Sequence, residues 1–113
     1  MDAQARLRFY RGSAQKVRLV ADTVRGQGVT RALAVLKLTQ RRCALDLEKL
    51  VRSAVANLEQ KSPGLDAGKL VLKSIRVDQG PSLKRFRAGS LGRVFPRHHR
   101  YCHVTVRVAE REE

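Results

Sequence analysis

The chain opens with a strict alternation of apolar and polar residues. The apolar positions share one face of an extended segment: Ala3, Ala5, Leu7 and Phe9. The opposite face carries two arginines, Arg6 and Arg8, together with Tyr10. A period of two is typical of a half-buried β-strand. We therefore predict a strand over residues 3–10 whose outer face suits contacts with phosphate and sugar.

A helical period replaces this alternation after Gly12. Four apolar residues recur at intervals of three and four positions: Val17, Val20, Ala21 and Val24. This spacing predicts an amphipathic helix, with the Ser13 hydroxyl capping its first turn and Gly26 ending it in a left-handed conformation. On the polar face, Arg18 and Asp22 are four positions apart, a spacing at which they can form a weak ion pair.

Two further helices are predicted downstream. The first takes Thr30 as its N-cap and buries a stripe of apolar residues: Val29, Ala32, Leu33 and Leu36. The second covers residues 41–60, where apolar side chains keep helical spacing. Residues 62–64, Ser-Pro-Gly, end it because proline cannot continue the helical hydrogen bonds and glycine permits the turn.

Two later segments have the patterns of strands, and a long stretch separates them. Residues 69–77 alternate weakly, whereas residues 102–108 alternate cleanly. In the first of these, one face is predicted to carry Val71, Ile75 and Val77, and the other Leu70 and Leu72.

About 24 residues without a helical pattern lie between these strands. A structureless loop of that length is usually functional or disordered. The alternative is a long β-hairpin, with Gly89 and Gly92 near its tip. Its apolar residues are scattered among Arg and Lys, and isolated two-stranded hairpins are marginal in water. We therefore expect an arm that is mobile alone and ordered by its partner.

Composition indicates the class of partner. The 113 residues suffice for one domain, and the 42% apolar content with 4% aromatics predicts an aliphatic core. The chain has 24 Lys and Arg against 10 Asp and Glu, a net charge of +14. This charge points to a polyanion, either nucleic acid or an anionic membrane surface. No apolar stretch is long enough for a transmembrane helix, and the charged N-terminal residues are unlike a signal peptide.

The charge is unevenly distributed along the chain. Residues 79–109 contain no Asp or Glu but seven Lys and Arg, which is half of the net charge of +14. A surface kept basic for solubility would mix both signs. The acid-free stretch therefore predicts contact with a polyanion along its length, with a solvated basic loop as the alternative.

Signatures of enzymes and metal sites are weak. Residues 26–28, Gly-Gln-Gly, begin like a dinucleotide loop, but no βαβ unit surrounds them, and the few acids are too scattered for a general acid–base pair. We expect no catalytic residue, no cofactor and no small-molecule substrate. One cluster contains the residue types that zinc favours: His98, His99, Cys102 and His103. Because neighbours on a strand point to opposite faces, we expect no metal site, and we interpret His98 and His99 as an extension of the RNA-facing surface. Cys43 and Cys102 are interpreted as core residues and not as a disulfide.

Arginine in the acid-free stretch is the strongest functional signal. Its planar guanidinium bridges phosphate oxygens and stacks on exposed bases, and RNA recognition favours such contacts over groove reading by a helix. Phe86 and Phe95 flank the predicted tip, where they either stack on bases or pack within the arm. Two other classes stay open: a free nucleic-acid chaperone, and a cationic membrane-surface protein, although the latter needs an aromatic-rich basic helix.

Three stretches match motifs of a known family. The first stretch comprises residues 12–22, Gly-Ser-Ala-Gln-Lys-Val-Arg-Leu-Val-Ala-Asp, followed by Val-Arg-Gly at 24–26. The second comprises residues 53–57 with Glu59, and the third residues 77–85. A closing signature fits at Lys84, Ser90, Gly92, Arg93, His103, Val104, Val106 and Val108. Over nearly its whole length the chain resembles the universal large-subunit ribosomal protein family numbered twenty-two, of bacterial type.

The resemblance implies the fold that the pattern suggests. This is an α+β fold with three helices packed on a small three-stranded antiparallel sheet and a long protruding β-hairpin. We expect a single domain over residues 1–113. Its globular body would comprise residues 1–78 and 101–113, and its extended basic arm about residues 79–100.

The resemblance also implies a function. A member of that family is a structural constituent of the large subunit of the cytoplasmic ribosome. It binds large-subunit rRNA, bridges several rRNA domains during assembly and contacts neighbouring ribosomal proteins. Its hairpin tip lines the exit tunnel beside the nascent peptide, and no membrane is involved.

Charge pattern and resemblance together indicate the candidate RNA-binding residues: Arg6, Arg8, Arg11, Lys16, Arg18, Arg25, Lys84, Arg85, Arg87, Arg93, Arg97, His98 and Arg100. The resemblance singles out Lys84, Arg85 and Arg93 in the arm, and it assigns the tip turn to Gly92. The predicted tip comprises Gly89, Ser90, Leu91, Gly92 and Arg93. The sequence differs from the family at Gly89, where Arg or His is usual.

Overall fold

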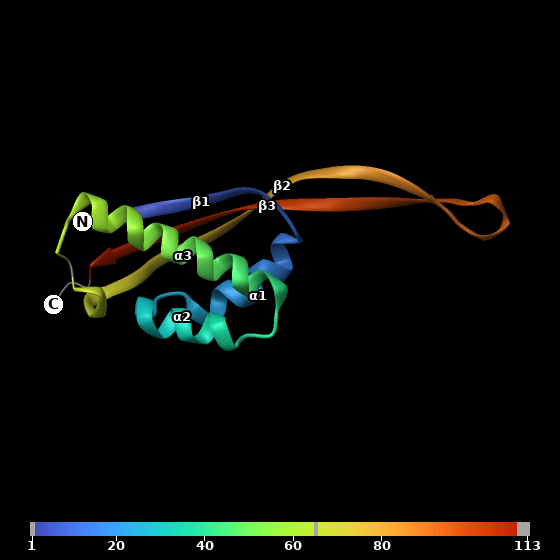
Figure 1. The fold of residues 1–113 in the computed structure, drawn as a ribbon. Helices are drawn as coiled ribbons and strands as arrows, with labels where there is room; N and C mark the ends of the chain where they lie inside the picture. The colour runs from blue at the N-terminus through green and yellow to red at the C-terminus, as the bar shows by residue number, and fades with distance from the viewer. Residues whose placement is uncertain (1, 65, 111–113) are drawn as a thin grey trace.

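A single antiparallel sheet runs the length of the molecule in the computed structural model, which describes residues 2–64 and 66–110 (Figure 1). Its strands are β1 (Asp2–Arg11), β2 (Leu70–Ala88) and β3 (Val94–Glu110), in the order β1-β3-β2. Residues 1, 65 and 111–113 of the predicted body lie outside the described residues. The three-stranded antiparallel sheet expected from the sequence is confirmed.

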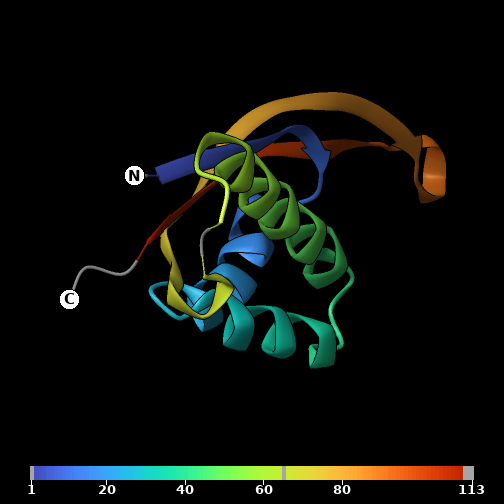
Figure 2. The same ribbon diagram turned by 60° about the vertical axis from the view of Figure 1, so that its left-hand side comes forward.

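Three helices cover one face of this sheet: α1 (Ala14–Val24), α2 (Val29–Leu38) and α3 (Arg42–Lys61) (Figure 2). Helix α3 packs across β1 and β3, α1 packs mainly on β2, and α2 lies against both other helices. Two short 3-10 turns, Ala67–Lys69 and Ser90–Gly92, complete the chain. The predicted α+β fold with three helices is therefore confirmed.

The core between helices and sheet is aliphatic. It consists of Ala, Val, Leu and Ile side chains with Cys102, and among the described residues no polar or charged one is buried. Cys43 packs at the edge of this core, and both cysteines are free. Burial of apolar surface, at about 25 cal/mol per Å², is therefore the main source of stability.

The helix boundaries correct two predictions. Helix α2 begins at Val29, with Gly28 at the N-cap, and the Ala32 amide donates to the Gly28 carbonyl at 2.9 Å. Thr30 therefore lies in the first turn, and its prediction as N-cap was wrong. Ser13 does occupy the N-cap of α1, but its side chain makes no capping hydrogen bond. Gly26 has a φ of 78°, as a left-handed residue after the helix requires.

A β-bulge in β2 overturns the predicted faces of that strand. Leu72 lies opposite Val108 and Ser74 opposite Arg107, so Lys73 is one extra residue. A bulge reverses the phase of alternation. Leu70, Leu72, Ile75 and Val77 are consequently all buried on the face that the helices cover. The prediction that placed Leu70 and Leu72 on the opposite face from Ile75 and Val77 was wrong.

A second bulge, in β1, overturns the prediction for Phe9. Leu7 lies opposite Val104 and Tyr10 opposite Cys102, so Arg8 and Phe9 together face His103. Phe9, predicted on the core face, is 60% exposed. Tyr10, predicted on the outer face, is instead half-buried and packs against the core.

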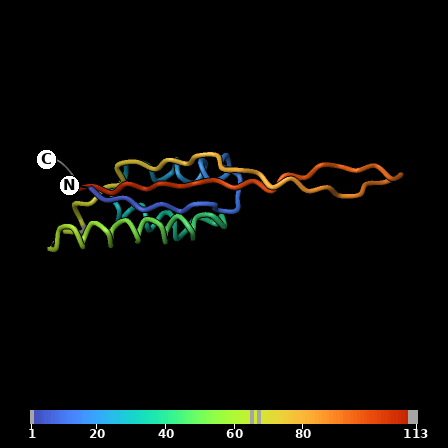
Figure 3. The backbone as a smooth tube through the Cα atoms, turned by 90° about the horizontal axis from the view of Figure 1, so that it is seen from above, coloured from blue at the N-terminus to red at the C-terminus, as the bar shows by residue number. Residues whose placement is uncertain are grey.

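The two longer strands continue beyond the helices as a hairpin. Their pairing runs from Ser82 opposite Arg100 to Ala88 opposite Val94. We call residues 79–100 the arm and the rest of the described chain the body. Figure 3 shows the arm leaving at the end opposite to the start of β1, and body and arm together extend over 64 Å. The hairpin alternative to a disordered loop is confirmed.

Candidate nucleic-acid interface

The register of the arm sorts its side chains onto two different faces. Because side chains alternate across a strand, the cross-strand pairs 83–99, 85–97 and 87–95 share one face, and the pairs 84–98, 86–96 and 88–94 share the other. The first face, which we call the arginine face, holds Arg85, Arg87 and Arg97 together with Leu83, Phe95 and His99. The second gathers four apolar residues towards the tip: Phe86, Ala88, Val94 and Pro96. Of the apolar residues that the sequence scatters along the arm, Leu83 and Phe95 thus share a face with the arginines, whereas Phe86 and Val94 lie on the other face.

The arginine face has no countercharge of its own. Arg85 lies directly opposite Arg97, and like charges in that position destabilise a strand pair. Among the described residues, every ion pair lies in the body. A polyanion laid along this face would supply the missing negative charge.

The tip is a tight turn with an exposed apolar residue at its end. Leu91 is 96% exposed and has a φ of 60°, and Gly92 follows with a φ of 73°. The Gly89 amide donates to the Arg93 carbonyl at 2.6 Å and closes the turn. The Phe95 ring fills the space that a Cβ at Gly89 would need. Glycine at 89 therefore lets Phe95 fold over the base of the tip.

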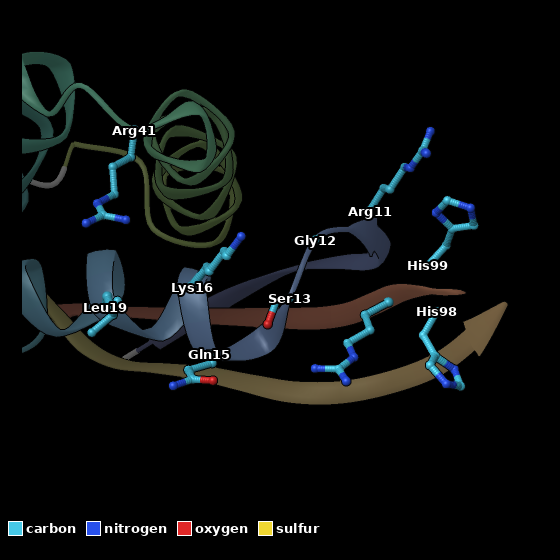
Figure 4. Close-up of a pocket in the computed structure, with 10 residues that line it drawn as sticks. Arg11, Gly12, Ser13, Gln15, Lys16, Leu19, Arg41, His98 and His99 are labelled. Carbon is cyan, nitrogen blue, oxygen red and sulfur yellow. The ribbon is translucent and has the colours of Figure 1, made fainter. Parts of the chain in front are cut away.

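Cationic side chains from separate parts of the chain line one groove where the arm leaves the body (Figure 4). This junction groove has a volume of about 760 Å³. Its lining residues are Arg11, Gly12, Ser13, Gln15, Lys16, Leu19, Arg41, His98, His99 and Arg100, and none of these is acidic. The Gly12 amide donates to the Arg100 carbonyl at 3.0 Å and ties the end of β1 to the start of the arm.

The junction groove unites four predicted site residues and adds two. Arg11, Lys16, His98 and Arg100 were predicted separately, and the fold brings them together. Arg41 was missed. Arg41 precedes α3 as its N-cap residue, and no periodic pattern marks its position. His99 was not among the predicted site residues, although the sequence had allowed it, with His98, to extend the RNA-facing surface.

Arg18 and Arg25 are exposed but engaged within the protein. The Arg18 guanidinium donates twice to the Val77 carbonyl, at 3.2 Å and 2.8 Å. Arg25 donates to the Ile75 carbonyl at 2.9 Å and forms an ion pair with Asp22. The spacing of Arg18 and Asp22 would allow an ion pair, but Asp22 pairs with Arg25 instead. Both arginines fasten α1 to β2, which leaves only part of each guanidinium for another partner.

The other predicted RNA-binding residues are all exposed, but not all are near the groove. Arg6 lies opposite Thr105 on the sheet face that the helices leave uncovered. Arg8 lies in the bulge of β1. Lys84, Arg85, Arg87, Arg93 and Arg97 are distributed along the arm. The candidate surface is thus extended and follows the arm.

Three titratable groups of the body, Tyr10, Cys43 and Cys102, pack in or against its core. The Tyr10 hydroxyl donates to Asp46 Oδ2 at 2.7 Å, and burial, followed by this hydrogen bond, raises the pKa of Tyr10. Burial also raises the pKa of the Cys43 and Cys102 thiols, so both are less prone to form reactive thiolates.

The described residues group no three His, Cys, Asp or Glu side chains in a way that would hold a metal ion. His103, from the zinc candidate, instead accepts a hydrogen bond from the Phe9 amide at Nδ1. No helix within the described ranges 2–64 and 66–110 has both the length and the apolarity to cross a bilayer.

Comparison with known proteins finds one family across almost the whole chain. Residues 5–109 match the family described as ribosomal protein L22p/L17e. Two similar relatives are both named large ribosomal subunit protein uL22. The one from Anaeromyxobacter sp. (strain Fw109-5) is 51% identical over 102 residues, covering 90% of this chain and 71% of the relative. The one from Myxococcus xanthus (strain DK1622) is 45% identical over 111 residues, covering 97% of each chain.

Proposed function

The chain belongs to the ribosomal protein L22p/L17e family, and from this premise we propose that it joins separate segments of large-subunit rRNA through its arm and junction groove. Membership makes it a structural, non-enzymatic constituent of the large ribosomal subunit. Its partners in the proposal are rRNA, neighbouring ribosomal proteins and, at the arm tip, the nascent peptide in the exit tunnel of a cytoplasmic ribosome.

The observation that carries the proposal is the uncompensated arginine face of the arm. Arg85 and Arg97 are held opposite each other, in a stretch of sequence without an acid. This arrangement costs free energy in water and becomes favourable when phosphates lie between the guanidinium groups. Repulsion between two rRNA backbones would be reduced in the same way where both approach the arm.

The junction groove supports a second contact at the root of the arm. Its cations come from β1, α1, the α2–α3 connection and β3, so a phosphate bound there would hold the arm to the body. We infer that the body anchors the protein on one rRNA segment while the arm reaches others. For the tip, support comes from the exposed Leu91 at the end of a narrow hairpin, a shape suited to a position beside the tunnel.

A salt wash of assembled large subunits tests the rRNA role. The wild-type protein should stay with the subunit, because many simultaneous contacts must break before it leaves. A variant with Lys84, Arg85, Arg87 and Arg97 changed to Gln should be released at lower salt. Each lost phosphate contact reduces the release of counterions that favours binding, so the variant binds rRNA more weakly. Equal retention of this variant would refute the role of the arm.

The matched control changes four exposed body cations to Gln: Arg31, Lys37, Lys49 and Lys69. It has the same net charge as the arm variant, and it should be retained like the wild type. Equal release of both variants would indicate only nonspecific charge, as expected for a free nucleic-acid chaperone. A photoreactive residue in place of Leu91 tests the tunnel role separately, because it should crosslink to a stalled nascent chain, whereas the same residue in place of Thr105 should not.

A further inference from the structure

The bulge in β1 holds an aromatic ring out of the core. Arg8 and Phe9 together lie opposite His103, between the pairs Leu7–Val104 and Tyr10–Cys102. Bulges often re-aim a side chain next to a functional site. Here the bulge turns Phe9 away from the aliphatic core and leaves it 60% exposed.

Phe9 also has an unfavourable backbone conformation. Its φ is 56°, in the left-handed region that bulky residues rarely adopt. Such strain persists only where the surrounding structure over-determines it, and it clusters at ligand-binding positions. Packing of the body does not account for it, because the Phe9 ring contributes nothing to the buried core.

His103 fixes both the backbone and the ring of Phe9. The Phe9 amide donates to His103 Nδ1 at 3.0 Å. The two rings meet edge to face, with centroids 4.8 Å apart and planes at 87°. The phenyl ring is therefore positioned before any partner binds, and binding need not pay the entropy of ordering it.

The exposed ring lies in a basic groove. This β1 groove has a volume of about 610 Å³ and is lined by residues 7–11 of β1 with Arg42 and Asp46 of α3. Three of its lining side chains are arginines: Arg8, Arg11 and Arg42. The one carboxylate, Asp46, already accepts the Tyr10 hydroxyl at 2.7 Å. The groove thus offers an aromatic surface among cations whose charges the groove itself does not balance.

We infer that Phe9 is a stacking platform for one unpaired base of the bound RNA, with Arg8, Arg11 and Arg42 contacting the phosphates on either side. This inference rests on the proposed rRNA-binding function and adds a base-binding subsite to it. Proteins that bind unpaired RNA combine a basic groove with an aromatic side chain on which a base stacks. An apolar protein segment would leave the three arginines without partners, so the groove favours RNA over a protein.

Binding of the full-length protein to single-stranded RNA tests the subsite. The probe is an oligouridylate of about 12 nucleotides, comparable to the site size of one single-strand-binding domain, with one central 2-aminopurine. A second oligonucleotide is abasic at that central position. Phe9→Leu should bind the base-bearing probe about 5- to 150-fold more weakly than the wild type and should lose the quenching of 2-aminopurine fluorescence that stacking produces. Phe9→Tyr should retain both, because it keeps the ring.

Two controls separate binding from folding. Phe9→Gly removes the ring and the left-handed strain together, so it should unfold at the wild-type temperature or above and still bind the probe as weakly as Phe9→Leu. Leu38→Ala shortens another apolar side chain that is 82% exposed, and it should bind like the wild type.

The results distinguish this inference from the proposed function. If the wild type binds RNA with strong salt dependence but Phe9→Leu binds equally well, the subsite is wrong and the rRNA role stands. If Phe9→Leu weakens binding to the abasic probe to the same extent, the groove does not hold a base, and the inference is overturned. If Phe9→Leu leaves RNA binding unchanged and weakens only a contact with another ribosomal protein, the partner was misassigned. Failure of the wild type to bind any RNA would overturn the proposed function itself.

Discussion

The body and the arm are built on the same two strands and differ in what covers them. In the body, β2 and β3 turn alternate side chains into the aliphatic core, where Val77 is only 4% exposed. A few residues later in the same strand, Phe86 is 75% exposed. The two strands pair in antiparallel fashion on both sides of this boundary, although a bulge between Gln79 and Ser82 shifts their register. Pairing alone therefore does not decide which part of a sheet is stable.

The body and the arm therefore differ in the source of the free energy that stabilises them. The body gains it by burying aliphatic side chains, so we expect it to fold without a partner. The arm buries none, and it pairs Arg85 against Arg97, so we expect its two strands to depend on a partner for stability. The same uncompensated charges that make the arm weak alone make it suited to a polyanion.

The largest effect expected is loss of stability from the body core. Leu47→Ala in α3 removes a side chain that is 2% exposed and should lower the free energy of unfolding by about 2–5 kcal/mol. Urea denaturation measures the change. Leu45→Ala in the same helix, 59% exposed, and Leu83→Ala in the arm should each stay within about 0.5 kcal/mol of the wild type. A comparable loss of unfolding free energy from Leu83→Ala would mean that the arm unfolds together with the core.

Removing the arm should separate binding from folding. A variant in which an Asn-Gly turn replaces residues 83–97 should keep one cooperative thermal transition, because the core residues all lie in the body. It loses five candidate contacts: Lys84, Arg85, Arg87, Arg93 and Arg97. The slope of log affinity against log salt for RNA should therefore become shallower by about 3.5–4.5. Loss of the cooperative transition would contradict the division into body and arm.

A charge reversal within the arm should stabilise the arm and weaken RNA binding. Arg97→Glu places a carboxylate opposite Arg85, and a cross-strand ion pair contributes about 0.2–1 kcal/mol. Amides of residues 82–100 should exchange hydrogen more slowly, while RNA affinity falls. Arg31→Glu in α2 is the control, with the same change in charge on the body. This control should change neither the hydrogen exchange of the arm amides nor the RNA affinity to a comparable extent. Faster exchange in Arg97→Glu would show that repulsion does not weaken the free arm.

The smallest effect should appear as a pH dependence confined to the body. Burial raises the pKa of Tyr10 above its ordinary 10.0 and that of Cys43 and Cys102 above 9.0. Groups whose pKa is raised by folding stabilise the protein below the unfolded-state pKa, and that contribution is lost as pH rises through the folded-state value. The stabilising contribution of these three groups should thus be constant below about pH 9 and decrease above it, so that thermal stability falls at alkaline pH. The arm holds no Tyr or Cys. Tyr10→Phe should lessen the fall, and an unchanged profile would contradict the assignment to Tyr10.

Prediction from the sequence succeeded where a pattern ran without interruption. The three helices, three strands and long hairpin follow from periodicity and from a stretch without a helical pattern. It failed at Phe9 and at Leu70 and Leu72, because one extra residue in a strand reverses every later side chain and leaves no mark in composition. The site was foreseen as a set of cations, but the meeting of Arg41 and His99 with Lys16 was not.

By itself, the sequence determined the aliphatic core, the element order and the concentration of positive charge in an acid-free arm, since each depends on local spacing or on counting. Only the tertiary structure decided which charges are free and which are engaged. It directed Arg18 and Arg25 to the carbonyls of β2, held Arg85 against Arg97 and turned Phe9 outward beside His103. The reason is physical: hydrogen bonds and like-charge contacts join residues distant in the chain, and their partners are chosen by strand register, which a bulge can shift by one residue.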